Sequence, residues 1–286
     1  MNNRTAVFLI STIDRKGLVA KITCFFAGLN LNILECRQYS DILEQRYYMR
    51  IAVELPPKLT RAAIEAEFQK LAAELELDFS IHYSGEKQNV AVMVSKTTHC
   101  LYDLLTNSEE NLLGSGKVKL VIGNHPELEE AAEKFRIPFY CFPVTRSGDP
   151  EQEKQIIDLL EKQKIDLVVL ARYMRILSND FINRFPARII NIHHAFLPAF
   201  MGGNPYQRAW ERGVKMIGAT AHYATADLDE GPIIEQDVER ITHESLPEDL
   251  RDRGRDIERR VLTRAVRAHL EHRVIISGHR TIVFSK

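Results

Sequence analysis

An amide and two imidazoles follow an apolar run in the C-terminal half of the chain. Residues 189–190 predict the end of a buried strand, and Asn191, His193 and His194 follow it directly. Pro198 then stops regular structure. In an open α/β sheet, ligands bind beyond the carboxyl ends of the strands, so these polar side chains are expected to face a site. The alternative is a capped strand end with satisfied polar groups, because an isolated histidine often serves structure alone.

An acidic loop between two β-rich runs favours the site over the capped strand end. The runs span 216–224 and 232–238, and the loop between them carries Asp229 in an Asp-x-Gly-Pro-Ile-Ile turn. Asn-x-His, with this aspartate 36 residues after the histidine, resembles the folate-dependent formyltransferase and formyl-hydrolase superfamily. In that superfamily an Asn, a His and an Asp form the catalytic constellation, and the matching positions here are Asn191, His193 and Asp229.

The side-chain types suit this chemistry. Attack on a formyl carbon puts negative charge on its oxygen, which an amide N–H from Asn191 and a protonated His193 would stabilise. Asp229 would hold the imidazolium through charge and hydrogen bonding, and it would orient a water molecule or accept its proton. Whether His193 or Asp229 takes the proton of the water stays open at this level.

Two further histidines lie close to these positions in the sequence. His222 precedes the acidic loop and matches a histidine that family members place there, so a role in supporting the catalytic side chains and a role as a satisfied core histidine are equally open. His194 would point away from His193 if the strand extended that far, which favours a structural role.

A segment after the apolar run 167–171 looks like the family segment that holds the folate ring. A flat heterocycle needs backbone donors and acceptors along its edge and apolar groups on its faces. Ordinary core packing is the alternative for its apolar members. The expected substrate-binding residues are Met174, Arg175, Ile176, Leu177, His222, Ala224 and Leu228.

Composition and charge limit the classes of partner. The 286 residues favour two domains, and 45% hydrophobic with 27% charged residues is ordinary for a globular protein. A formal net charge of -1 argues against a nucleic-acid binder, and no run approaches the ~20 apolar residues of a membrane span. Four scattered cysteines without metal-ligand spacing predict no metal site and reduced thiols in the cytoplasm. Cys24, Cys36 and Cys141 lie in apolar runs and are expected in the core.

The N-terminal segment predicts a split βαβ, ferredoxin-like unit. The expected elements are strand 4–11, helix 18–29, strands 33–42 and 47–55, helix 60–75 with Thr60 as its cap, and strand 77–82. Residues 14–19 and 32–33 make the segment similar to ACT domains, regulatory modules of amino-acid metabolism. The resemblance implies an ACT regulatory or oligomerisation domain over 1–84, with a candidate amino-acid effector near Gly17, Leu18, Asn32 and Ile33; pairing without any ligand is the alternative.

From residue 85 to 286, apolar strands alternate with helices. The strands are expected at 90–94, 117–122, 139–142, 167–171 and 189–192, and the helices at 99–113, 127–135 and 151–163. This alternation predicts a Rossmann-like, formyltransferase-like catalytic domain with a mostly parallel sheet. A long amphipathic helix is expected over 246–272, followed by β-like runs at 274–276 and 281–284. Its charged run 251–264, including Asp252, Asp256 and Glu258, predicts a solvated face.

The formyl acceptor is the remaining question. Relatives that transfer the group to glycinamide ribonucleotide carry a glycine-rich loop for its phosphate, whereas residues 95–101 contain no glycine here. Water is therefore the simplest acceptor. With the ACT-like unit in front, the whole chain resembles the formyltetrahydrofolate deformylase family. The resemblance implies hydrolysis of 10-formyltetrahydrofolate to tetrahydrofolate and formate in support of one-carbon balance and purine synthesis.

The same resemblance implies a cytoplasmic homo-oligomer, a dimer or tetramer, that uses the folate as substrate and needs no prosthetic group. The alternative function is a formyltransferase that moves the group to a small amine. A third alternative is a non-enzymatic amino-acid sensor with a folate-binding second domain, which an intact Asn191, His193 and Asp229 set disfavours.

Overall fold

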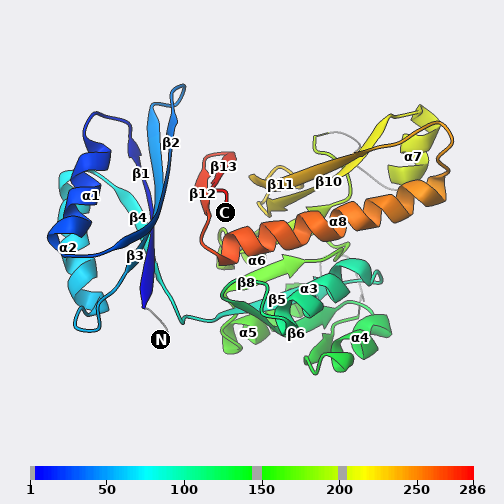
Figure 1. Ribbon diagram of the computed structural model, residues 1–286. Coiled ribbons are helices and arrows are strands. Elements are labelled where there is room, and N and C mark those ends of the chain that lie inside the picture. Colours follow the sequence, from blue (N-terminus) through cyan, green and yellow to red (C-terminus); the bar gives the residue numbers. More distant parts are fainter. Residues whose placement is uncertain (1–3, 144–149, 199–204) are drawn as a thin grey trace. The chain divides into compact units, whose positions relative to one another are not determined.

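The computed structural model describes residues 4–143, 150–198 and 205–286, which belong to two compact units (Figure 1). The first unit runs to Glu86 and also includes His272–Ile275 and Ile282–Lys286. The second unit comprises Lys87–Glu271 and Ile276–Thr281. Within the described parts of the chain, no helix combines the length and the apolar character that a membrane crossing requires.

The first unit has the expected βαββαβ order. Its elements are β1 (Thr5–Ile13), α1 (Leu18–Gly28), β2 (Ile33–Asp41), β3 (Arg46–Glu54), α2 (Arg61–Glu74) and β4 (Asp78–Tyr83). The four strands form an antiparallel sheet in the order β2-β3-β1-β4. The prediction for the start of the second helix is confirmed, because the Thr60 hydroxyl accepts a hydrogen bond from the Ala63 amide at 3.2 Å.

Aromatic side chains fill the core between this sheet and its two helices. Phe8 of β1 contacts Phe26 of α1 and Phe68 of α2, with ring centroids 5.0 and 4.8 Å away. Each fully buried ring of this size contributes roughly 1.5–3 kcal/mol to stability through removal from water. On another part of the sheet, Leu9 and Tyr48 pack with Phe284, which explains why the C-terminal residues belong to this unit.

The second unit alternates strands and helices around a seven-stranded sheet. In chain order the elements are β5 (Gln88–Val94), α3 (His99–Glu109), β6 (Gly116–Gly123), η1 (Pro126–Leu128), α4 (Glu129–Lys134), β7 (Phe139–Cys141), α5 (Pro150–Lys162), β8 (Leu167–Leu170), α6 (Asn179–Arg184), β9 (Ile189–His193), α7 (Pro205–Arg212), β10 (Met216–Tyr223), β11 (Ile233–Arg240) and α8 (Pro247–Leu270). The strands β12 (Val274–Ser277) and β13 (Arg280–Val283) form a separate two-stranded sheet.

The prediction of a mostly parallel sheet is confirmed for this unit. The strand order is β11-β10-β9-β8-β5-β6-β7, and all pairs from β9 to β7 are parallel. The β9–β10 and β10–β11 pairs are antiparallel. The carboxyl end of β9 therefore lies next to the antiparallel hairpin β10–β11.

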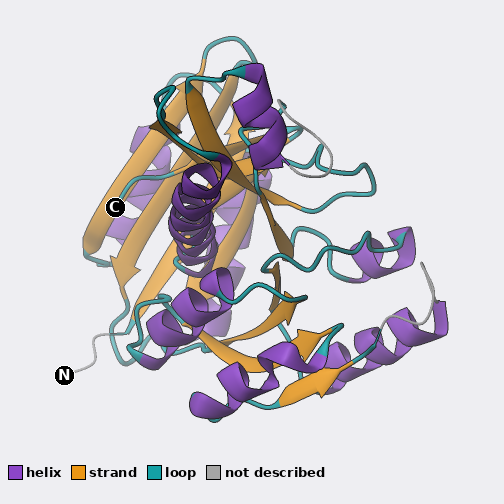
Figure 2. Cartoon of the chain, turned by 90° about the vertical axis from the view of Figure 1, so that its right-hand side faces the viewer, coloured by secondary structure: helices purple, strands orange, loops and turns teal. Residues whose placement is uncertain are grey.

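Helices cover both faces of the sheet (Figures 1 and 2). Residues of α5 and α6 share a core with side chains from one face, such as Met93 and Val168. The helices α3 and α8 contact each other, and α8 also contacts β9, β10 and β11. Buried strands with apolar side chains on both faces follow from this three-layer arrangement, because neither face is left to solvent.

Several details differ from the sequence-based expectations. The short helices α6 and α7 were not expected, because six to eight residues give too little periodicity to recognise. The helix α3 ends at Glu109 rather than 113, since Asn111 adopts a left-handed φ of 58°. The expectation of core cysteines was wrong for Cys24, Cys36 and Cys141, which are exposed; Cys100 is the buried one. An apolar run on an amphipathic helix or strand still turns some of its side chains toward solvent.

Candidate active site

The strand β9 carries two of the three expected catalytic side chains. Asn191 and His193 are two residues apart, so the alternation of a strand turns them to the same face. His193 is buried, and β9 pairs with β8 on one side and β10 on the other. The strand thus presents an amide and an imidazole where the parallel part of the sheet meets its antiparallel edge.

The loop between β10 and β11 brings the carboxylate to this pair. Asp229 Oδ2 lies 3.1 Å from Nδ1 of His193, although the two residues are 36 positions apart. Asp229 has a left-handed φ of 58°, which aspartate tolerates better than most residues. Two residues on, a Cβ at Gly231 would overlap the carbonyl oxygen of Tyr223, so only glycine allows the loop to close this tightly. The turn chemistry therefore sets the position of the carboxylate.

His222 lies behind these side chains and is almost fully buried. Its Nδ1–H donates to the Tyr223 carbonyl oxygen at 3.0 Å. Its Nε2 lies 3.2 Å from Nδ2 of Asn191 and 3.5 Å from Oδ1 of Asp229. A neutral His222 accepts a hydrogen bond from the Asn191 amide, and a charged one donates to Asp229. In either state, it orients the two catalytic candidates.

Asn191, His193 and Asp229 form a trio whose electrostatics favour an ionised aspartate. Hydrogen bonds from His193 and then His222 hold the pKa of the Asp229 carboxyl well below its usual range, although burial acts in the opposite direction. The other ring nitrogen of His193, Nε2, is buried and has no hydrogen-bond partner among the described residues. One nitrogen is thus fixed by the carboxylate, and the other is free to exchange a proton with a bound molecule.

A cavity of ≈ 590 Å³ opens beside the trio, within the range of about 300–1,000 Å³ that small-molecule sites occupy. All three catalytic candidates line it. Four of the expected folate-binding residues line it as well: Met174, Arg175, Ile176 and Leu228. Met174 and Ile176 are 63% and 71% exposed, so core packing does not explain these apolar side chains.

Comparisons with known proteins identify the family. Residues 88–266 match the sequence family described as Formyl transferase. A formyltetrahydrofolate deformylase from Synechocystis sp. is 46% identical over 286 residues, which are 100% of both chains. The crystal structure of a formyltetrahydrofolate deformylase from Pseudomonas syringae has a TM-score of 0.93 to this chain at 39% identity, and the match covers 100% of this chain and 96% of that one. The chain belongs to the formyltetrahydrofolate deformylase family.

A neighbouring enzyme class shares only part of this deformylase-family chain. Glycinamide ribonucleotide transformylase 1 from Symbiobacterium toebii has a TM-score of 0.67 at 31% identity, and the match covers 71% of this chain and 97% of that one. The fold with a mostly parallel sheet is therefore common to both classes.

Three of the residues expected to bind the folate are not among those that line the cavity of this deformylase-family member. Leu177 and Ala224 pack against the core formed with α5 and α6, and His222 contacts Asn191 and Asp229 of the cavity lining. His194, expected to point away from His193, instead stacks on it with ring centroids 4.8 Å apart. The strand ends at His193, so its alternation no longer governs the next side chain.

A group of polar residues in the same cavity was not expected from the sequence. His99, Arg172, Tyr206 and Glu258 line it together with the trio. The interpretation of Glu258 as part of a solvated helix face was wrong, because its side chain is 1% exposed. The available signal was its register in α8, where it follows the buried Ile257 and precedes the buried Val261 on the apolar stripe.

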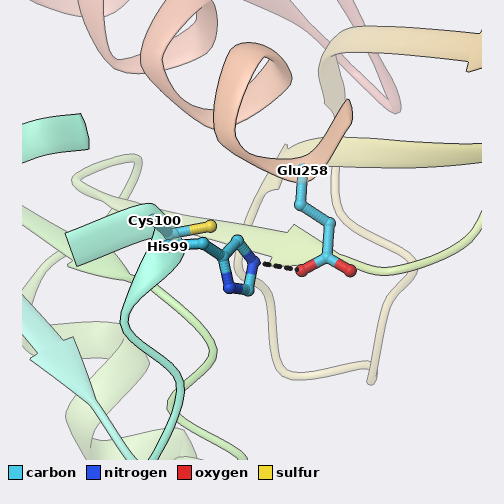
Figure 3. A group of neighbouring side chains, drawn as sticks. All are labelled: His99, Cys100 and Glu258. Carbon is cyan, nitrogen blue, oxygen red and sulfur yellow. Dashed lines mark hydrogen bonds and ion pairs between the residues drawn. The ribbon is translucent and has the colours of Figure 1, made fainter. Parts of the chain in front are cut away.

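His99, Cys100 and Glu258 place three potential metal ligands within 4.8 Å of one another (Figure 3). Glu258 is already engaged by His99 at 2.9 Å and by the hydroxyl of Tyr206 at 2.6 Å. Burial raises the pKa of the Cys100 thiol well above its usual value, which disfavours the thiolate that binds metals. The donor set therefore fits an internal hydrogen-bond network better than a metal.

The first unit has a cavity of its own, of ≈ 660 Å³. Gly17 and Leu18, two of the expected effector-binding residues, line it with Asp14, Arg15 and Ser40. Asn32 and Ile33 are not among its lining residues. Gly17 has a φ of 90° at the N-cap of α1, so its backbone bends where a side chain would be strained.

Proposed function

We propose that this chain hydrolyses 10-formyltetrahydrofolate to tetrahydrofolate and formate. The observation that carries the proposal is the His193–Asp229 pair beside Asn191 at a cavity with an exposed apolar lining. The names of the deformylases that resemble the chain over its whole length support the same reaction. The folate enters as substrate, and the proposed steps use side chains of the chain itself.

The steps follow from the geometry of the trio. Asp229 keeps the Nδ1–H of His193 directed at itself, so Nε2 faces the substrate and exchanges the proton. Water adds to the formyl carbon and gives one proton to Nε2 of His193, and the oxyanion that forms is stabilised by the Asn191 amide and by the protonated His193. The carbon–nitrogen bond then breaks, N10 of the folate takes up this proton from His193, and formate leaves as the anion while the second proton of the water passes to solvent.

The contact between the Asn191 amide and Asp229 Oδ1 is long, at 3.4 Å. The other contact of this amide, with Nε2 of His222, is shorter, at 3.2 Å. The contact with Asp229 is therefore the weaker one, and a developing oxyanion would replace it. The folate ring is assigned to the apolar lining formed by Met174, Ile176 and Leu228, with Arg175 at its edge. Ring faces and apolar side chains then exclude bulk water from the reacting carbon.

The loop after β5 supports water rather than a phosphate-bearing amine as the acceptor. It contains no glycine between Ser95 and Leu101, so a Cβ on every residue keeps the backbone from close approach to a phosphate. Its lysine, Lys96, forms an ion pair with Glu127 at 3.6 Å. A transferase that uses a small amine is the competing function, and the assay below separates the two.

The deciding experiment measures formate released from 10-formyltetrahydrofolate without any added acceptor. Wild type is expected to release formate with multiple turnovers. Asp229→Asn keeps the size of the side chain but removes its charge, and it is expected to lower the rate about 10²–10⁴-fold. Asp227→Asn, in the same exposed loop and outside the cavity lining, is the matched control and should retain activity. Folate binding without turnover would instead favour a sensor.

We further propose that the first unit is an ACT regulatory domain in a homo-oligomer, with the cytoplasm as its location. Its βαββαβ order and its own cavity next to Gly17 support an amino-acid effector, whose carboxylate suits the amides at the start of α1. Calorimetric titration with glycine and methionine tests this assignment. Heat of binding that disappears when Gly17 is replaced by Val would support it, and no binding by either amino acid would refute it for these two effectors.

A further inference from the structure

A second buried carboxylate lies in the cavity of the trio, and none of the proposed steps uses it. Glu258 is in the middle of α8, a 24-residue helix whose other charged side chains are mostly exposed. His99, Arg172 and Tyr206 reach it from three other segments. All four residues line the same cavity as Asn191, His193 and Asp229.

The contacts are short and come from separate elements. Nε2 of His99, the first residue of α3, lies 2.9 Å from Oε2 of Glu258 (Figure 3). The Tyr206 hydroxyl, from α7, donates to Oε1 at 2.6 Å. Nε of Arg172, which follows β8, is 3.5 Å from Oε2. One carboxylate thus connects α3, α7, α8 and the end of β8.

This network holds an ionised carboxylate. Burial alone would raise the pKa of Glu258, but the hydrogen bond from His99 and the charge of Arg172 outweigh it, so the pKa is lowered. A buried charge with several partners is costly to disturb, because loss of one member leaves the others uncompensated. The side chains of His99 and Tyr206 are therefore held in one arrangement.

The backbone around Glu258 is shaped to allow these contacts. A Cβ at Gly254, one turn earlier in α8, would collide with the ring and hydroxyl of Tyr206. A glycine inside a helix is destabilising relative to alanine, so its presence here has a local reason. Arg172 has a left-handed φ of 64°, a conformation that a non-glycine residue rarely adopts and that often marks functional sites.

The cavity lining is of two chemical kinds. Met174, Ile176 and Leu228 are apolar and suit the folate ring, whereas the lining around Glu258 is polar and suits the attacking nucleophile. A water molecule occupies about 30 Å³ in the liquid, and any amine with a carbon chain needs more. Rigid His99 and Tyr206 rings would admit the first and obstruct the second.

We propose that Glu258 is a specificity-determining residue: it holds His99 and Tyr206 as a wall that lets water, but not a primary amine, reach the formyl carbon. The inference rests on the proposed hydrolysis and explains why water is chosen. In wild type, a water oxygen bonds to the formyl carbon, the bond from that carbon to N10 then breaks, N10 gains one proton of the water, and the other is released as formic acid ionises to formate. In a variant with a loosened wall, an amine nitrogen takes the place of water, gives one proton to N10 and becomes the formamide.

The test is a competition between water and an amine. The enzyme is given 10-formyltetrahydrofolate with and without excess glycinamide in mildly alkaline buffer, and formate and N-formylglycinamide are quantified together. Their ratio does not depend on the fraction of correctly folded enzyme. His99→Ala removes the imidazole ring from the wall, and Tyr206→Phe removes the hydrogen bond from the Tyr206 hydroxyl to Glu258. Glu258→Gln removes the charge of the carboxylate that holds both side chains. Arg259→Gln, next to Glu258 but paired with Asp256 at the surface, is the matched control.

Wild type and Arg259→Gln are expected to give formate almost alone. His99→Ala and Glu258→Gln should raise the share of N-formylglycinamide at least ~10-fold, the lower end of what a single methylene-sized difference in a pocket discriminates. Tyr206→Phe should shift it in the same direction by less. If the folded His99→Ala and Tyr206→Phe variants give the same ratio of N-formylglycinamide to formate as wild type, the proposal is overturned. This holds even if these variants release formate more slowly. Wild type that releases no formate would instead refute the hydrolysis itself.

Discussion

His193 is fixed at one ring nitrogen and open at the other. Asp229 binds Nδ1 at 3.1 Å, and Nε2 has no partner among the described residues. A third residue, His222, contacts both Asn191 and Asp229 and so limits how far either can turn. This is the arrangement that a proton-exchanging imidazole requires: one nitrogen bound by an orienting group and the other directed at the substrate.

The pKa of Asp229 provides a direct test of this arrangement. His193 is the largest cause of its lowering, so His193→Asn should bring the pKa back toward its normal value of about 3.9. In wild type, the folded-state pKa lies below the unfolded one. The hydrogen-bonded Asp229 carboxylate therefore stabilises the fold above about pH 4, and this contribution is lost as the pH falls through the folded-state value. Carboxyl-carbon NMR titration of both proteins measures the shift.

The matched control is His222→Asn, which removes the second cause and should raise the pKa less. Equal pKa values for Asp229 in wild type and His193→Asn would contradict the proposed pairing.

At the scale of elements, the site depends on how α7 and α8 pack. Tyr206 lies against bare backbone at Gly254, so one helix approaches the other more closely than a side chain would permit. The same contact positions the Tyr206 hydroxyl for Glu258. A glycine that the helix itself disfavours thus serves the packing between two helices.

Gly254→Ala is expected to lower the free energy of unfolding by about 1–3 kcal/mol, because the new Cβ overpacks against Tyr206. In the Tyr206→Ala background the same change should cost less, since the obstructing ring is gone. Gly28→Ala, in α1, is the control: nothing lies within 4 Å of its added Cβ, so it should be neutral or stabilising. Urea unfolding of the four variants gives the values. A cost that is the same in both backgrounds would exclude the Tyr206 contact as its source.

At the scale of the whole molecule, the first unit has exposed apolar side chains at an edge of its sheet. The strand β2 is an edge strand, and the turn after it presents Ile42 and Leu43, which are 86% and 91% exposed. Asp41 builds this turn through hydrogen bonds from the Leu43 and Glu44 amides, so its shape does not depend on the apolar side chains. Exposed apolar groups beside an unpaired edge favour association with another copy.

The double change Ile42→Asp/Leu43→Asp should therefore lower the mass of the oligomer. Charges at this position would be buried without partners if the edges pair. Sedimentation velocity on wild type, the double variant and Leu112→Asp, which alters an exposed leucine of the second unit, makes the comparison. A wild-type protein that sediments as a monomer, or a double variant of unchanged mass, would refute an interface at this edge.

The sequence by itself determined the local features. Periods of two and of about 3.6 residues located most strands and helices, and turn chemistry at Asp229 and Thr60 marked where elements begin or bend. Asn191, His193 and Asp229 were recognisable because two short motifs carry them in a fixed order. These are properties of neighbouring residues, and neighbouring residues are what a sequence displays directly.

Only the tertiary structure decided what depends on distant partners. Glu258 meets His99 across 159 positions, so its burial and its charge follow from the packing of α3 on α8. The structure also separated Ile176, which lines the cavity, from Leu177, which packs into the core. Side chains of the same type differ in role because burial and hydrogen bonding are set by the elements that surround them, and adjacent residues in the chain can face entirely different surroundings.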